Sequence, residues 1–135
     1  MLKRLSHATV YVLNHDSAIE FYTQKLGLEL RTDAKMGDFR WVTVGVPGQP
    51  DLEIALMEPK AGMVFDEETA AQLRALVKKG ILGGGAFDTD DCLATYEELK
   101  ARGVQFRHAP KQEVYGLATA FQDDSGNFFS LSQQT

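Results

Sequence analysis

His7 and Glu53 are the two residues of this chain whose types and positions could do acid–base chemistry. His7 lies in an alternating stretch, residues 6–13, where it shares one face with Thr9 and Tyr11. Glu53 lies in a second alternating stretch, residues 52–57. On neighbouring strands that face one cavity, the carboxylate could orient the imidazole as a general acid–base pair. The alternative is that both side chains only anchor a ligand or hold the cavity together.

The single cysteine, Cys92, provides neither a disulfide framework nor a thiolate metal cluster. It lies where a helix is expected to begin, a position that can lower the pKa of a thiol. No catalytic partner accompanies it, so we interpret Cys92 as a small structural residue. A chain without disulfides fits a reducing compartment, and we expect a cytoplasmic protein.

Composition excludes two classes of partner. The formal net charge is −5, with acids and bases interleaved and no basic stripe, which argues against nucleic acid. A membrane helix needs about 20 consecutive apolar residues, and the chain has no such stretch. Hydrophobic residues make up 44% and charged residues 24% of the 135 residues, as is typical of one globular domain.

Hydrophobic periodicity predicts the order of elements in the first half of the chain. After the strand at residues 6–13, Asn14 or Asp16 can cap a helix that runs to about Leu26 and ends at Gly27. Alternation and turn residues then predict three strands, at residues 28–32, 39–46 and 52–57. A further helix begins at Asp66 and ends at Gly80.

The second half repeats this order of elements. A strand at residues 84–89 precedes a helix that is capped by Asp90 or Asp91 and ends at Gly103. Strands at residues 104–107, 114–122 and 127–132 follow. At an offset of about 76 residues, His7 falls on Gly84, and Glu53 falls on Ser130. We therefore predict an α+β fold of two paired βαβββ modules.

Each module has one helix for its sheet, so one face of each sheet stays uncovered. Side by side, the two modules could form a curved mixed sheet with a cup-shaped cavity and the helices on the outer face. The predicted single domain, residues 1–135, divides into module 1 (about 5–58), a connecting helical segment (59–82) and module 2 (about 83–133).

Several short motifs, in order over nearly the whole chain, resemble the vicinal oxygen chelate superfamily of glyoxalases, bleomycin-resistance proteins and extradiol dioxygenases. The family's final hairpin usually has proline where Asp124 stands. The matching features are His7, residues 19–22 (IEFY), 25–28 (KLGL), 52–54 (LEI), 96–99 (YEEL), 101–104 (ARGV) and 121–127 (FQDDSGN). The resemblance implies paired modules around a cup and a homodimer.

The resemblance also implies four positions for metal ligands, one on the first and one on the last strand of each module. In this sequence they are His7, Glu53, Gly84 and Ser130. Glycine has no side-chain ligand and a serine hydroxyl is a poor one at neutral pH, so the site is incomplete. We expect no cofactor and no tightly bound metal, and a weakly bound divalent metal at His7 and Glu53 stays open.

Alternation also predicts which side chains line the cup. An aromatic-lined cavity with a few polar groups suits a small organic ligand. The alternative is that Trp41 and Phe128 fill the cup or a dimer contact. The candidate ligand-binding residues are Thr9, Tyr11, Trp41, Met57, Tyr115, Phe128 and Ser130.

Three functions are compatible with these residues. The incomplete metal site favours a metal-free, bleomycin-resistance-like protein that binds a small molecule in the cup, and this is our prediction. His7 and Glu53 favour the alternative, a metal-dependent lyase, isomerase or dioxygenase of the glyoxalase or extradiol type. A metal-independent enzyme that uses His7 and Glu53 as acid and base is the third. We expect a small-molecule partner and a second copy of the chain, without nucleic acid or membrane.

Overall fold

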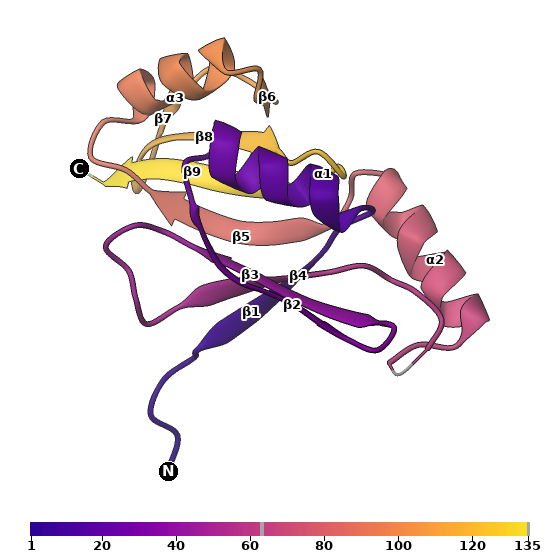
Figure 1. The fold of residues 1–135 in the computed structure, drawn as a ribbon. Helices are drawn as coiled ribbons and strands as arrows, with labels where there is room; N and C mark the ends of the chain where they lie inside the picture. Colours follow the sequence, from indigo (N-terminus) through magenta and orange to yellow (C-terminus); the bar gives the residue numbers. More distant parts are fainter. Residues whose placement is uncertain (63, 135) are drawn as a thin grey trace.

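Each half of the chain folds into its own sheet with its own helix, as the sequence predicts (Figure 1). The computed structural model describes residues 1–62 and 64–134. The first half contains β1 (His7–Tyr11), α1 (His15–Glu20), the π-helical turn η1 (Phe21–Lys25), β2 (Glu29–Met36), β3 (Phe39–Gly45) and β4 (Glu53–Met57). The connecting helix is α2 (Glu67–Lys78). The second half follows it and contains β5 (Gly83–Asp88), α3 (Cys92–Ala101), β6 (Gln105–Phe106), β7 (Lys111–Glu113), β8 (Gly116–Gln122) and β9 (Phe128–Gln134).

The α+β class and the paired modules are confirmed, and the chain forms two separate sheets. The first sheet has the strand order β1-β4-β3-β2, and the second has the order β5-β9-β8-β6, with β7 paired to β8. In both sheets the first strand pairs in parallel with the last strand of its module. Among the described residues, β1 and β5 are therefore edge strands, with no hydrogen-bonded ladder joining the two sheets.

Side-chain caps begin all three α-helices, and two of them resolve alternatives that the sequence left open. Asn14, not Asp16, caps α1 by accepting a hydrogen bond from the backbone N–H of Ser17 at 2.9 Å. Asp91, not Asp90, caps α3 through the N–H of Ala94. Asp66 caps α2 in the same way. Each cap satisfies an N–H group that has no partner within its helix.

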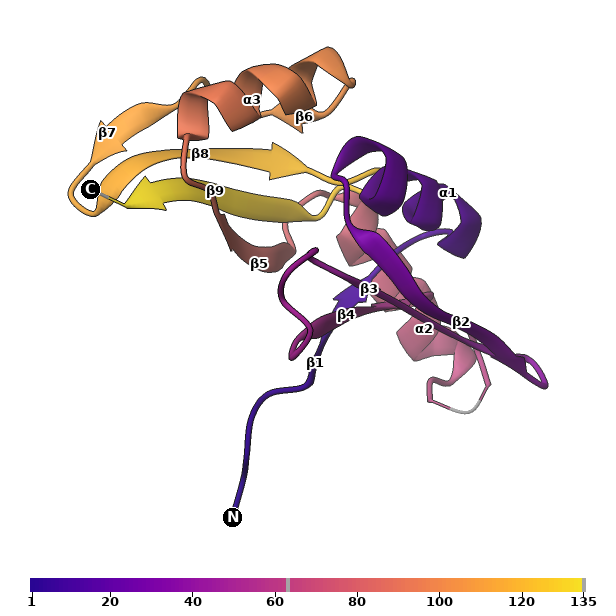
Figure 2. The same ribbon diagram turned by 60° about the vertical axis from the view of Figure 1, so that its left-hand side comes forward.

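The two halves share one hydrophobic core, although their sheets are separate. Val10, Val12, Val42 and Val44 of the first half belong to the same buried cluster as Phe121, Phe129 and Leu131 of the second half. Helix α1 lies beside β9 of the other half (Figures 1 and 2), and the rings of Tyr22 and Phe129 are 6.2 Å apart. The halves therefore fold as one unit through this core.

A hydrogen-bonded turn between β8 and β9 also ties the halves together. Asp123 Oδ1 accepts hydrogen bonds from the backbone N–H groups of Ser125, Gly126 and Asn127, each at 2.9 Å. Asp123 Oδ2 accepts one from the Tyr22 hydroxyl at 2.7 Å, and burial together with the Asp123 carboxylate raises the pKa of Tyr22. Asn127 Nδ2 donates to the carbonyl of Tyr11. The turn is thus bonded to both α1–η1 and β1.

Some element boundaries differ from those that the sequence predicts. The segment after β6 forms an additional strand, β7, which pairs with β8. β2 extends to Met36, and β9 extends to Gln134. Among the described residues, no helix has the length and apolar character needed to cross a bilayer.

Candidate functional site

The uncovered face of the first sheet carries most of the residues that the sequence singled out. Val42 and Val44 point into the core, so Trp41 and Thr43 point to the opposite face. On that face the β1 residues His7, Thr9 and Tyr11 lie beside the β4 residues Glu53, Ala55 and Met57. The structure therefore brings together six predicted site residues: His7, Glu53, Thr9, Tyr11, Trp41 and Met57.

His7 and Glu53 are direct neighbours across the β1–β4 ladder. His7 Nε2 lies 3.7 Å from Glu53 Oε1, and His7 Nδ1 lies 3.0 Å from the hydroxyl oxygen of Ser6. A gap of 3.7 Å is longer than a hydrogen bond, so the pair is loose. The ring of Trp41 is 5.7 Å from the imidazole, and Phe39 stacks on Trp41 at 6.4 Å. This face therefore combines an imidazole and a carboxylate with aromatic rings.

One buried hydroxyl on this face lacks a partner. Thr43 is fully buried between β2 and β4, and its Oγ1 makes no hydrogen bond. Among the described residues it is the single buried side-chain polar atom in this condition. An unpaired buried hydroxyl costs about 1–3 kcal/mol, because it has lost its water without gaining a protein partner.

We expect Thr43→Val to stabilise the protein by about 1 kcal/mol, because valine keeps the shape of threonine and removes the unpaired hydroxyl. The measurement is the urea midpoint of unfolding. Thr119→Val is the matched control: Thr119 is also a buried strand residue, but its Oγ1 donates to the carbonyl of His108, so this variant should lose stability. Equal losses in both variants would show that Thr43 Oγ1 has a partner.

The uncovered face of the second sheet carries Ser130 and Phe128, two further predicted site residues. Ser130 lies opposite Ala86 of β5 and Ala120 of β8, so small side chains surround it. The guanidinium of Arg107 lies 4.3 Å from the centre of the Phe128 ring, a cation–π contact. Among the described residues, no hydrogen bond, ion pair or aromatic contact joins this face to His7 or Glu53.

Gly84 does not occupy the cup-facing position that the alternation assigned to it. The β5–β9 register shifts between Gly83 and Gly85, and a Cβ on Gly84 would lie 2.3 Å from the ring of Phe129 in the core. The residue opposite Ser130 is Ala86. The shift moves Gly84 to the core face because one extra residue reverses the alternation of side chains.

The side chains around His7 and Glu53 do not fit a tightly bound metal ion. His7 and Glu53 supply one imidazole and one carboxylate, while Ala86 and Ser130 stand on the corresponding strands of the second sheet. Within residues 1–62 and 64–134, no group of three His, Cys, Asp or Glu side chains has the geometry to hold a metal. Stable sites for zinc and non-haem iron require at least three protein ligands.

Two other residues lie away from both uncovered faces. Tyr115 is exposed at the turn between β7 and β8, and no aromatic contact recorded for the described residues joins it to His7 or Trp41. Cys92 is buried at the start of α3, where burial raises the pKa of its thiol, so it stays in the unreactive protonated form. This agrees with its interpretation as a structural residue.

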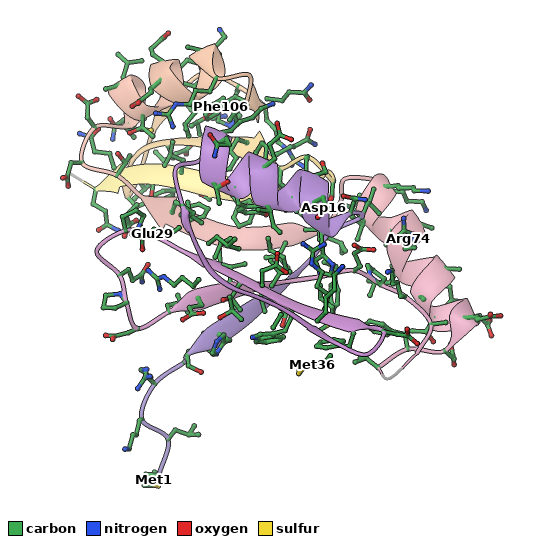
Figure 3. All side chains as sticks on the ribbon, in the orientation of Figure 1. Met1, Asp16, Glu29, Met36, Arg74 and Phe106 are labelled. Carbon is green, nitrogen blue, oxygen red and sulfur yellow. The ribbon has the colours of Figure 1, made fainter. Side chains whose placement is uncertain are left out.

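A cavity of about 650 Å³ lies at the end of the first sheet and was not predicted from the sequence. The β2–β3 hairpin, the start of α1 and the segment after β4 form its walls, and Figure 3 labels Met36 and Asp16 at two of these. Met57 and Phe39 belong both to the cavity wall and to the face that carries Trp41. The cavity is therefore continuous with the uncovered face of the first sheet.

A buried histidine–glutamate pair lies in the wall of this cavity. Glu58 Oε2 accepts hydrogen bonds from the backbone N–H of His15 at 2.8 Å and faces His15 Nδ1 at 3.0 Å. His15 Nε2 lies 2.8 Å from the carbonyl oxygen of Leu56. His15 was not identified as a site residue from the sequence, and its one sequence signal is a histidine directly after the helix cap Asn14.

The guanidinium of Arg40 holds the hairpin wall of the cavity in place. It forms a two-point contact with Asp33 at 2.9 Å per bond and a third bond with Asp16 at the start of α1. The hydrogen bonds from Arg40 lower the pKa of Asp33, and both carboxylates raise the pKa of Arg40. Arg40 therefore joins the β2–β3 hairpin to the start of α1 through charge-assisted hydrogen bonds.

Comparison with known proteins identifies relatives over almost the full chain. The model of the glyoxalase/bleomycin resistance protein/dioxygenase superfamily matches residues 4–131. The uncharacterized protein YetH of Bacillus subtilis is 30% identical over 98% of this chain and 100% of its own length. The crystal structure of UcmS2 is 44% identical with a TM-score of 0.94, over 99% of this chain and 100% of that one. TnmS3, an antibiotic binding protein from Streptomyces sp. CB03234, is 25% identical with a TM-score of 0.78, over 99% and 98% of the two chains.

Proposed function

This chain belongs to the glyoxalase/bleomycin resistance protein/dioxygenase superfamily, and we propose that it binds a small organic molecule on the uncovered face of its first sheet without catalytic metal. The observation that carries the proposal is the continuity between the His7–Glu53–Trp41 face and the cavity of about 650 Å³. Binding sites for small molecules are commonly 300–1,000 Å³ in volume and lined by aromatic side chains with a few polar groups. The likeness to TnmS3, an antibiotic binding protein, supports the same ligand class.

We further propose that a second copy of the chain completes the site. The candidate residues divide into two sets, one on the face with His7 and Trp41 and one on the face with Phe128 and Ser130. Among the described residues, no hydrogen bond, ion pair or aromatic contact joins the two sets within one chain, and the edge strands β1 and β5 have no ladder on their outer sides. A twofold dimer would place the second-sheet face of one copy opposite the first-sheet face of the other, twice.

In this proposal His7 and Glu53 position the ligand through polar contacts, and Trp41 and Phe39 stack on its flat body. A metal-dependent lyase, isomerase or dioxygenase is the second candidate, and it rests on the same two residues. It would need further ligands from another chain, because the first sheet supplies two.

We expect His7→Ala to weaken ligand binding at least threefold while changing the melting temperature by less than about 2 °C. His7 has 41% of its side chain exposed, so its truncation creates no buried cavity. The probe is 2-naphthol, followed through the indole N–H signal of Trp41, which is unambiguous because the chain has one tryptophan. Val12→Ala, a core truncation, is the control for nonspecific loss of stability. A large drop in melting temperature with unaltered affinity would refute the binding role of His7.

A further inference from the structure

Glu58 lines the cavity beside the first sheet and has spare hydrogen-bonding capacity. Both ring nitrogens of His15 lie within hydrogen-bond distance of an oxygen atom, Nε2 at 2.8 Å from Leu56 O and Nδ1 at 3.0 Å from Glu58 Oε2. The backbone N–H and the ring Nδ1 of His15 thus both engage Glu58 Oε2. Among residues 1–62 and 64–134, the charged group recorded beside Glu58 Oε1 is Lys60 Nζ at 3.7 Å.

The contact between Glu58 Oε1 and Lys60 leaves the oxygen available to a ligand. Lys60 is 65% exposed and lies beyond hydrogen-bond distance, whereas the side chain of Glu58 is 13% exposed. An ion pair with an exposed lysine contributes little, because water and salt screen it. Within the part of the chain that the structure describes, Glu58 Oε1 is therefore a largely buried acceptor without a strong partner, in a residue that lines the cavity.

The rest of the wall determines which kind of ligand fits. The wall carries three acidic residues (Asp16, Asp38 and Glu58) and three basic residues (Lys35, Arg40 and Lys60), so it offers little net charge to an ionic ligand. Apolar surface comes from Phe39, Met57 and Phe65, and Phe65 packs edge-on against Tyr11 of the uncovered face. A flat, uncharged body therefore fits this wall better than an anion or a cation does.

We propose that the His15–Glu58 pair is the polar end of the ligand site, where Glu58 Oε1 accepts a hydrogen bond from a hydroxyl or amide N–H of an uncharged aromatic ligand. The proposal rests on the proposed function, since it assigns the ligand to the face that carries Trp41. His15 is the positioning residue: its ring and its backbone N–H hold the carboxylate by Oε2, which keeps Oε1 directed at the cavity.

Two probes of nearly equal shape test this assignment. 2-Naphthol has a hydroxyl donor, and 2-methoxynaphthalene has an oxygen that can only accept. Titration of the ¹⁵N-labelled protein with each probe is followed at the Trp41 indole N–H and at the His15 backbone amide. The native protein should bind 2-naphthol about tenfold more tightly, because a hydrogen bond to a carboxylate discriminates by about that factor. The His15 amide should shift with 2-naphthol and much less with the ether.

Glu58→Gln is the decisive variant. Its amide oxygen faces the two donors of His15, so the NH₂ group replaces Oε1 and the site changes from acceptor to donor. The preference for 2-naphthol should fall below about twofold, since both probes can accept from this NH₂ group. Glu97→Gln, on the exposed surface of α3, is the matched control and should keep the tenfold preference.

The possible outcomes separate this inference from the function on which it rests. If both probes shift Trp41 with equal affinity, or if the preference persists in Glu58→Gln, the assignment of Glu58 is wrong and the binding face stands. If neither probe shifts Trp41, the binding face is wrong and the inference fails with it. If Glu58→Gln does not fold, the His15 amide of the native protein decides: an equal shift with both probes overturns the assignment.

Discussion

Asp123→Ala should destabilise the protein by about 4 kcal/mol, a large share of the roughly 5–15 kcal/mol that stabilises a domain of this size. The carboxylate is 6% exposed and accepts hydrogen bonds from the backbone N–H groups of Ser125, Gly126 and Asn127. It also accepts from the Tyr22 hydroxyl. Alanine leaves these donors without partners in a site from which water is excluded.

The loss should affect both halves of the molecule. The turn that Asp123 organises is bonded to the first half, because Ser125 Oγ accepts from the backbone N–H of Leu13 and Asn127 Nδ2 donates to the carbonyl of Tyr11. Amide hydrogen exchange in β1 should therefore accelerate in Asp123→Ala, although β1 is more than a hundred residues away in the chain.

The urea midpoint of unfolding measures the effect, and the neighbouring residue provides the control. Asp124 is exposed, and its described side-chain hydrogen bond is one from Ser17 Oγ at 2.6 Å. Asp124→Ala should cost less than about 1 kcal/mol, since water replaces that contact. Similar losses for the two substitutions would mean that Asp123 does not organise the turn.

The sequence predicted the modules because their signals are local. Asn14, Asp66 and Asp91 are side-chain caps directly before apolar stripes, and the alternation in β1, β3 and β4 identifies the uncovered face of the first sheet. His7 and Glu53 follow from that alternation, and the structure places them side by side.

The remaining features depend on contacts that a linear pattern does not contain. Asp123 reads as one of several turn residues, and its bond to Tyr22 spans 101 positions. Glu58 reads as a charge after a strand, and its partner His15 lies 43 positions earlier. The separation of the two sheets depends on which strand edges meet, and alternation contains no information on that question.

The bulge in β5 is the feature at which the pattern gave a wrong position. Alternation counts two residues per repeat, and the register shift between Gly83 and Gly85 adds one residue to one strand. The run of three glycines was a visible signal, since glycine within a strand often marks a bulge. In the structure, Gly84 provides room for the ring of Phe129.

Gly84→His should abolish cooperative folding, whereas Ala86→His should change the free energy of unfolding by less than about 0.5 kcal/mol. A Cβ on Gly84 would meet the Phe129 ring at 2.3 Å, and Phe129 is 1% exposed within the shared core. The φ angle of Gly84 is not positive, so the penalty is steric and an imidazole enlarges it. Ala86 is exposed and lies opposite Ser130 on the uncovered face, where a histidine has room.

Thermal unfolding monitored by circular dichroism distinguishes the two variants. Gly84→Ala should lower the free energy of unfolding by about 3 kcal/mol, because its Cβ makes the same clash with Phe129. If Gly84→His folds as stably as the native protein, the side chain at position 84 points away from Phe129 and the alternation was right. If Ala86→His is the stable variant, the position that corresponds to His7 in the second module is 86, because Ala86 pairs with Ser130 as His7 pairs with Glu53. Any attempt to rebuild a metal site on this scaffold must then place its imidazole at Ala86 and its carboxylate at Ser130.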